Sequence, residues 1–108
     1  MDLDLLIPDE LYHLATQADW DAYQSAGTIT PPSLADEGFV HCSYGHQVPG
    51  TVGRHFEGVT DLLALRLDPS LLGDALLVEE DSYGSGQTYP HIYGPIPTVA
   101  VLDSVAVA

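Results

Sequence analysis

The stretch LYHLAT, residues 11–16, contains the two signals that decide the fold, a strand and the start of a helix. An apolar run of this length around a single histidine is typical of a short strand, here Leu11–Ala15. Thr16 follows with a side-chain oxygen suited to a helix N-cap, so we expect a helix over Ala18–Ser25 that ends at Gly27. A strand that leads directly into a short helix indicates a domain of mixed α and β structure.

Outward from this stretch, strands dominate the expected structure. We predict strands over 38–43, 62–68, 75–79 and 99–107, where apolar and β-branched residues are concentrated. A second helix is expected over 46–56. Proline argues against regular structure in Thr28–Leu34 and against a central strand in Tyr89–Pro97. Together these elements predict an α+β fold with a mainly antiparallel or mixed sheet and two or three short helices.

The composition is that of an acidic chain with enough apolar residues for a core. Its 108 residues are 45% hydrophobic, so we expect a single folded domain over residues 1–108. The chain has sixteen Asp and Glu residues and only two cationic residues, Arg54 and Arg66, so its net charge is −14. A surface of this charge repels phosphate backbones and anionic lipids, which argues against nucleic-acid and membrane-surface partners.

Cysteine usage and hydropathy give expectations about compartment and assembly. The lone cysteine, Cys42, cannot form an internal disulfide, and no apolar run reaches the ~18 residues of a membrane span. The start MDLD, residues 1–4, lacks the features of a signal peptide, so we expect a cytoplasmic protein. The apolar residues 105–108 are expected at a sheet edge, where they can pair with a second subunit in a homodimer.

Three histidines carry the strongest functional signal. His13, His41 and His91 each lie among apolar or aromatic neighbours, and imidazole titrates close to neutral pH. We expect them to converge on one cleft as acid–base catalysts, although a single histidine in such surroundings is also typical of a hydrogen-bonded core. Ser43 shares a strand face with His41 and joins them as a catalytic candidate. No two of the three have the short spacing of zinc ligands, so no metal site is expected.

Residues near these histidines are the candidates for substrate binding, with core packing as the alternative for the aromatic ones. They are Tyr12, Thr16, Trp20, Glu79, Tyr89 and Tyr93. Glu79 ends a predicted strand beside a flexible loop, which is a common position for a catalytic carboxylate. Cys42 is expected to be buried, and His46 and His55 are expected at the surface. The glycine-containing loop Asp81–Thr88 either closes over the cleft or is a mobile surface connection.

Over residues 11–105 the sequence resembles the bacterial and plant proteins grouped as domain of unknown function 952. The resemblance rests on an ordered set of motifs at 12–16 with Trp20, 32–34, 38–43, 47–50, 72–73 and 90–97. That family is grouped with the ADP-ribosyltransferase-like superfamily. The resemblance therefore implies split β-sheets around a cleft, in which a first-strand histidine or arginine, a second-strand tyrosine or serine and a later glutamate hold NAD.

The resemblance also implies which residues would hold NAD in this chain. His13 matches the first element, residues 41–43 match the second, and Glu79 or His91 would stand for the third. Pyrophosphate binding needs cationic side chains or clustered backbone N–H groups, and this chain has two arginines and no glycine-rich phosphate loop. No cofactor is therefore expected, and NAD is the alternative that the resemblance supplies.

Taken together, the residues favour a small enzyme that binds a neutral organic molecule. His13 and His41 would transfer protons in an isomerisation, elimination, cyclisation or hydrolysis, while Ser43 and His91 orient the substrate. Two alternatives remain open: ADP-ribosyl-type transfer from NAD, and a non-catalytic ligand-binding or partner module. Convergence of the histidines distinguishes the enzymatic hypotheses from the module.

Overall fold

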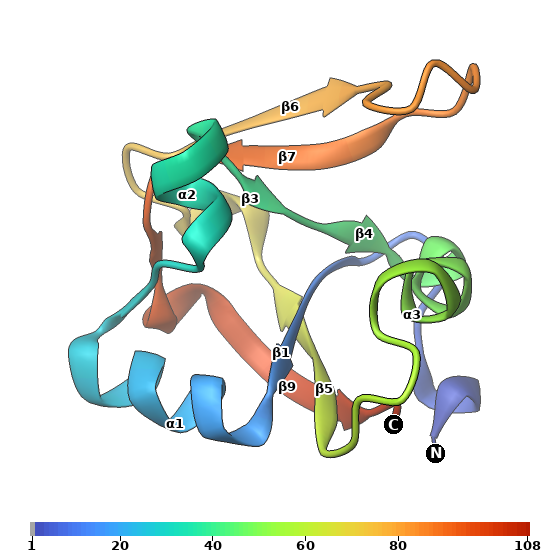
Figure 1. Ribbon diagram of the computed structural model, residues 1–108. Coiled ribbons are helices and arrows are strands. Elements are labelled where there is room, and N and C mark those ends of the chain that lie inside the picture. The colour runs from blue at the N-terminus through green and yellow to red at the C-terminus, as the bar shows by residue number, and fades with distance from the viewer. Residues whose placement is uncertain (1) are drawn as a thin grey trace.

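The computed structural model describes residues 2–108, which form three antiparallel sheets and three α-helices (Figure 1). The strands are β1 Leu11–Thr16, β2 Thr28–Ile29, β3 Val40–His41, β4 Ser43–Tyr44, β5 Leu62–Leu67, β6 Leu76–Glu80, β7 Tyr89–Tyr93, β8 Ile96–Pro97 and β9 Val101–Ala106. The α-helices are α1 Gln17–Ala26, α2 Pro32–Glu37 and α3 Val48–His55. The prediction of an α+β fold with antiparallel strands is therefore confirmed.

Strands β4, β1, β5 and β9 form the larger sheet in that order, and this sheet separates two apolar clusters. In β1, Leu11 and Ala15 belong to one cluster and Tyr12 and Leu14 to the other, as the two-residue period of a strand requires. Because both faces are covered, β1 and β5 are buried along most of their length and need apolar residues at nearly every position.

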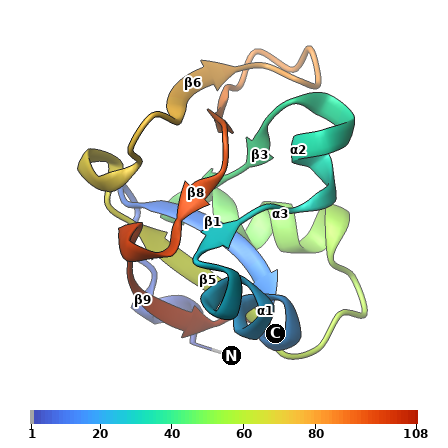
Figure 2. The same ribbon diagram turned by 90° about the vertical axis from the view of Figure 1, so that its left-hand side faces the viewer.

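Strands β3, β7 and β6 form a smaller sheet with one apolar and one polar face, and in Figure 1 it lies above the larger sheet. Val40, Leu77 and Ile92 pack into the core that the two sheets share. His41 and His91 are directly paired on the opposite face. The remaining strands, β2 and β8, form a short ladder beside α1 (Figure 2).

The helix predicted after the first strand is confirmed as α1. The Thr16 hydroxyl accepts a hydrogen bond from the backbone N–H of Asp19 at 3.2 Å, which is the N-cap contact that the sequence predicts. At the other end, Gly27 has φ +84° and donates its N–H to the Tyr23 carbonyl. Glycine suits this left-handed C-cap because it has no Cβ.

The prediction of an extended loop over Thr28–Leu34 is wrong at both of its ends. Residues 28–29 form β2, and α2 begins at Pro32. Proline is well tolerated at the first position of a helix, because the N–H that it lacks has no partner within the helix there. The double proline therefore precedes and starts a helix rather than preventing one.

The single strand predicted over 38–43 is divided between the two sheets. Val40 and His41 pair with β7, whereas Ser43 and Tyr44 pair with β1. Cys42 lies between them, and its N–H donates to the Pro90 carbonyl at 3.0 Å. The chain thus crosses from one sheet to the other within one residue, which brings both sheets to a common edge.

The prediction that Tyr89–Pro97 is too proline-rich for a central strand is wrong, because β7 is the middle strand of the smaller sheet. Pro90 directs its carbonyl towards Cys42, and its missing N–H would point to the same side. The β3 ladder ends at His41 on that side, so the proline lies where the pairing stops and not in the middle of the ladder.

The other predicted elements are confirmed, with their ends shifted by at most two residues. β5 and β6 match the strands expected over 62–68 and 75–79, and α3 follows a short 3-10 turn within 46–56. β9 lies at the edge of the larger sheet, as expected for the end of the chain, and its pairing with a second subunit stays a prediction. Within residues 2–108, no helix is long and apolar enough to span a membrane.

Candidate functional site

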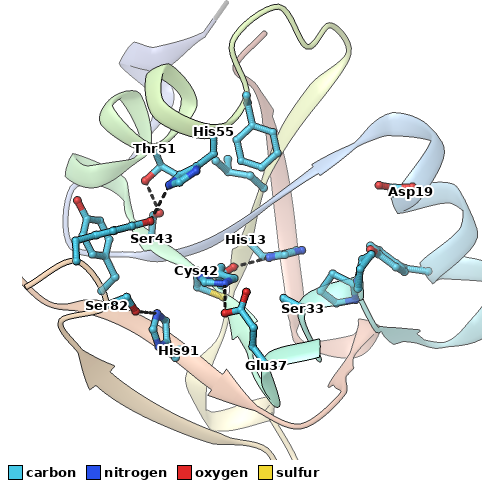
Figure 3. A pocket seen from close by; sticks show the side chains of 18 residues that line it. His13, Asp19, Ser33, Glu37, Cys42, Ser43, Thr51, His55, Ser82 and His91 are labelled. Carbon is cyan, nitrogen blue, oxygen red and sulfur yellow. Dashed lines mark hydrogen bonds and ion pairs between the residues drawn. The ribbon is translucent and has the colours of Figure 1, made fainter. Parts of the chain in front are cut away.

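A cavity of about 590 Å³ opens beside the polar face of the smaller sheet (Figure 3). Its walls come from β1, α1, α2, the β3–β4 segment, α3, and the β6–β7 loop with β7. This volume suits a small organic molecule. The four predicted catalytic residues, His13, His41, Ser43 and His91, all line the cavity, although they come from four different strands and both sheets.

His41 and His91 face each other across the β3–β7 ladder. Their ring centroids are 5.2 Å apart and their planes meet at 78°, an edge-to-face arrangement. Phe39 lies two residues before His41, so it is on the same face of the sheet. Its ring stacks on His91 at a centroid distance of 4.0 Å and meets His41 edge-on at 4.8 Å. This aromatic packing restricts the orientation of both imidazoles.

His13 reaches the cavity from the larger sheet. Its Nδ1 lies 2.8 Å from the carbonyl oxygen of His41, and a carbonyl can only accept, so Nδ1 carries the hydrogen. Burial lowers the pKa of His13, which keeps the ring neutral at pH 7 and leaves the basic lone pair on Nε2. All fully buried side-chain nitrogens and oxygens in residues 2–108 have partners. Nε2 of His13 has no hydrogen-bond partner, so this nitrogen is not fully buried and is open to the cavity.

His41 is held by a carboxylate from α2. Its Nε2 lies 3.0 Å from Oε2 of Glu37, and both side chains are about half exposed, at 47% and 49%. Because the carboxylate accepts, Nε2 carries the hydrogen in this contact. Glu37 was not among the predicted site residues, because no helix was expected directly before the strand. The four-residue spacing from His41 was the only available signal.

Both ring nitrogens of His91 are engaged. Nδ1 lies 2.9 Å from Oε1 of Glu80, and Nε2 lies 3.2 Å from Oγ of Ser82. The Tyr93 hydroxyl donates to the same Glu80 oxygen. Hydrogen bonds from Tyr93 and then His91 lower the pKa of Glu80, so this carboxylate is ionised at neutral pH.

The Ser43 hydroxyl is buried and lies 3.0 Å from the Thr51 hydroxyl of α3. Thr51 in turn donates to the Gln47 carbonyl, so Ser43 is the donor to Thr51. Cys42 lies between His41 and Ser43 and is buried, as predicted. Burial raises the pKa of its thiol far above neutral, so Cys42 stays protonated and is a poor nucleophile.

Of the six residues predicted to bind substrate, Tyr89 lines the cavity. Its hydroxyl accepts a hydrogen bond from Arg54 at 2.8 Å, and the Arg54 guanidinium also lies over the rings of Tyr83 and Tyr89. Among the described residues, Arg54 has no carboxylate within ion-pair distance. A cation without a counter-ion beside the cavity is unusual in a chain of charge −14.

The other five predicted substrate-binding residues lie outside the cavity wall, as far as residues 2–108 show. Tyr12 points to the far side of the larger sheet, where its hydroxyl accepts from the backbone N–H of Ile7. Thr16 caps α1, Trp20 packs against the core, and Tyr93 holds Glu80.

Glu79 lies on the face of β6 opposite to the one that reaches the site. β6 extends one residue further than predicted, to Glu80, and neighbouring strand residues point to opposite faces. Glu79 pairs with Pro90 on the face away from His91, whereas Glu80 shares the face of His91 and contacts it. A one-residue difference in the strand end therefore decides which carboxylate reaches the site.

The two remaining histidines are exposed, as expected, but they differ in position. His46 stacks on Tyr44 outside the cavity. His55 is at the rim, where its Nε2 lies 2.7 Å from the Tyr83 hydroxyl. No group of three or more metal-ligating side chains is found in the part of the chain that the structure describes.

The loop Asp81–Thr88 borders the cavity, with Ser82 and Tyr83 among the lining residues. Its first residue, an aspartate, accepts two hydrogen bonds from backbone N–H groups within the loop. Gly84 and Gly86 have φ values of +64° and +86°, so the shape of the turn itself needs glycine at both positions. Closure of this loop over the cavity stays a prediction.

These observations define the chain as a small α+β domain with a histidine-lined cavity between two sheets. The model of the family described as "Protein of unknown function (DUF952)" matches residues 14–104. The chain therefore belongs to the DUF952 family, as the motifs in its sequence indicated.

Solved structures of one relative agree with this assignment. The crystal structure of protein CC0527 from Caulobacter crescentus is similar to this chain with a TM-score of 0.79 and 29% identity, covering 91% of this chain and 85% of that one. A crystal structure of a double mutant of CC0527 has a TM-score of 0.78, 28% identity and the same coverage. The solution NMR structure of CC0527 has a TM-score of 0.75 and 29% identity, covering 91% of this chain and 84% of that one. Comparison with curated proteins gave no match.

Proposed function

We propose that this protein is an enzyme that uses His13 as a general base and His41 as a general acid on a neutral organic molecule in the cavity. The protonation and hydrogen bonding of the His13 ring are the main support for this proposal. The ring is buried and neutral, its Nδ1 is fixed by a carbonyl, and its Nε2 is open to the cavity. Such a base accepts a proton at neutral pH without first having to lose one.

The surrounding contacts support complementary roles for the other predicted residues. Glu37 fixes the His41 ring, which is half exposed and can exchange protons with solvent. Ser43, and His91 through the Ser82 hydroxyl, are suited to orient the substrate. Isomerisation, elimination, cyclisation and hydrolysis all need a proton removed at one atom and delivered at another. The net charge of −14 disfavours an anionic substrate.

The convergence of the histidines supports an enzyme over a non-catalytic module. His41 and His91 are 5.2 Å apart between ring centroids, and His13 contacts the backbone of His41. A binding module has no need to hold three titratable rings in one cavity, whereas proton transfer requires each group within hydrogen-bond reach of a common substrate.

ADP-ribosyl-type transfer from NAD, within an ADP-ribosyltransferase-like fold, is the second candidate. The observation in its favour is Arg54, whose guanidinium lies beside the cavity without a carboxylate partner among residues 2–108 and can bind a pyrophosphate. Isothermal titration with NAD tests this candidate. Binding that is lost in Arg54→Gln would favour it, and no heat at millimolar NAD would end it.

Deuterium exchange tests the acid–base proposal without a known substrate. The protein is incubated in D₂O with a panel of neutral ketones, hydroxyketones and lactones, and exchange is followed by ¹H NMR. We expect exchange or turnover of at least one compound, reduced about 10²–10⁴-fold in His13→Gln. His46→Gln changes an exposed histidine outside the cavity and serves as the matched control.

A second measurement tests the state of His13 directly. In ¹⁵N-labelled protein, Nδ1 should give the signal of a protonated nitrogen and Nε2 that of an unprotonated one at pH 7. Activity that survives both His13→Gln and His41→Ala, or the reverse tautomer at His13, would contradict the proposal.

A further inference from the structure

We propose that Ser82, His91 and Glu80 form a serine nucleophile with its base and orienting carboxylate, which transfers the acyl group of small neutral esters. The three side chains form one continuous chain of contacts. Ser82 Oγ lies 3.2 Å from His91 Nε2, and His91 Nδ1 lies 2.9 Å from Glu80 Oε1. These distances are those of a nucleophile and base in hydrogen-bond reach, with the base held by a third group.

The hydrogen positions follow from the partners. Glu80 is ionised and also accepts from the Tyr93 hydroxyl, so it can only accept from His91 Nδ1. When Nδ1 carries the only ring proton, the lone pair of His91 is on Nε2. The Ser82 hydroxyl must then donate to Nε2, which is the orientation that a general base needs to activate an oxygen nucleophile.

The base of this unit is rigid, and its nucleophile is accessible. His91 is 2% exposed, lies in the middle strand of the smaller sheet, and stacks on Phe39. Ser82 is exposed, and it lines the cavity from the loop that follows β6. Figure 3 shows its hydroxyl turned towards the His91 ring. A fixed base behind an exposed hydroxyl leaves room for a substrate carbonyl on the cavity side.

The chemical step is balanced with water as the co-reactant. Ser82 Oγ attacks the ester carbonyl carbon, and its proton passes to His91 Nε2. The bond between the carbonyl carbon and the alcohol oxygen breaks, and His91 returns the proton to that oxygen as the alcohol leaves. Water then attacks the acyl-Ser82 ester with His91 as base, which releases the acid and restores the serine.

The walls of the cavity select the substrate class. Leu14, Phe56 and Pro31 supply apolar contacts, and a chain of charge −14 repels an anionic acyl group. A small, uncharged acyl ester fits both conditions. The unit shares the cavity of the proposed acid–base site but does not use His13 or His41, so each proposal can fail without the other.

Diisopropyl fluorophosphate, a small neutral reagent, tests the nucleophile. Attack by Ser82 forms an oxygen–phosphorus bond and expels fluoride, and mass spectrometry locates the adduct. We expect modification of Ser82 that is abolished in Ser82→Ala and unchanged in Ser85→Ala, a serine of the same loop that does not line the cavity. His91→Gln should slow the reaction at least 100-fold. Hydrolysis of p-nitrophenyl acetate should show a burst of one p-nitrophenolate per chain, released as Ser82 is acylated.

Glu80 acts through His91 and is a positioning residue, so its test needs a pH profile. In Glu80→Gln the labelling rate should fall. The pH at which the rate reaches half of its maximum should also decrease, because the imidazolium that forms loses its carboxylate partner. A structural role alone would lower the rate without moving the profile.

The outcomes separate this unit from the acid–base site. Labelling of Ser82 that survives His13→Gln and fails with His91→Gln supports the proposal. No labelling of the wild-type protein, equal labelling of Ser82→Ala, or dependence on His13 in place of His91 would overturn it. Ser82→Ala changes an exposed loop residue, so its folding, checked by circular dichroism, should match the wild type.

Discussion

The two principal sheets of this domain differ in what covers their faces. The larger sheet is covered on both sides by apolar clusters, and its central strands β1 and β5 are buried almost throughout. The smaller sheet has one apolar face, with Val40 and Ile92 in the shared core, and one polar face with His41, His91 and Glu80. The larger sheet therefore supplies most of the stability, and the smaller sheet presents most of the reactive groups.

Position in the fold separates two kinds of histidine. His91 and His41 lie on a face that needs no apolar covering, so each is free to pair with a carboxylate. His13 lies on a face of the larger sheet that packs into the core, and it is neutral because burial disfavours its charged form. The cavity combines both kinds, which gives it a neutral base beside carboxylate-paired imidazoles.

The largest expected effect tests whether stability resides in the larger sheet. Leu65 is completely buried in β5, so Leu65→Ala should lower the free energy of unfolding by about 2–5 kcal/mol. Val99→Ala truncates a side chain that is 74% exposed, so it should change the free energy of unfolding by less than about 0.5 kcal/mol. Urea denaturation measures both. A loss below about 1 kcal/mol for Leu65→Ala would mean that the larger sheet is not the stable half.

The next effect concerns the burial of neutral His13. Its pKa is lower in the folded than in the unfolded chain, so the unfolded chain binds more protons as the pH falls below about 6.5. Stability is therefore full above that pH and decreases on acidification, by up to about 1.4 kcal/mol per pH unit.

Denaturation curves between pH 5 and pH 7 measure this slope. His13→Gln should have a shallower slope than the wild type, and His46→Gln, which changes an exposed histidine, should keep it. Equal slopes in wild type and His13→Gln would show that His13 is not held neutral by the fold.

A smaller effect is expected at the junction of the larger sheet with α1. Thr16→Ala removes the hydroxyl that accepts from Asp19 N–H, and it should cost about 1 kcal/mol of unfolding free energy. Thr60→Ala changes an exposed threonine outside the helices and strands and should have almost no effect. If the two variants have equal stability in urea, Thr16 does not cap the helix in solution.

The smallest expected effect is at the surface of the larger sheet. Arg66 pairs with Glu10 at 3.0 Å and with Asp103 at 2.8 Å, and this pairing lowers the pKa of Asp103. Arg66→Gln should lower the free energy of unfolding by less than Thr16→Ala does, because exposed ion pairs are screened by water and salt. The difference from wild type should shrink in 1 M NaCl. A difference that salt does not reduce would indicate a packing role for the arginine side chain.

Features that depend only on neighbouring residues could be predicted from the sequence. Thr16 and Gly27 delimit α1 because a cap needs only a hydroxyl and a residue without a Cβ at fixed spacing. The apolar runs of β1 and β5 are typical of strands that are buried on both faces. The three histidines stood out because each lies among apolar neighbours, and the ordered motifs identified the family.

Which groups meet in the cavity depends on contacts between segments that are distant in the sequence. The strand crossing at Cys42 and the central position of β7 depend on pairing between distant segments, which no local pattern encodes. Glu80, and not the predicted Glu79, contacts His91 because side chains alternate along a strand. An error of one residue in the predicted end of β6 therefore exchanges the two faces. Tyr12 was expected at the site and lies behind it for a related reason: a strand buried on both faces has no polar side to show which way each residue points.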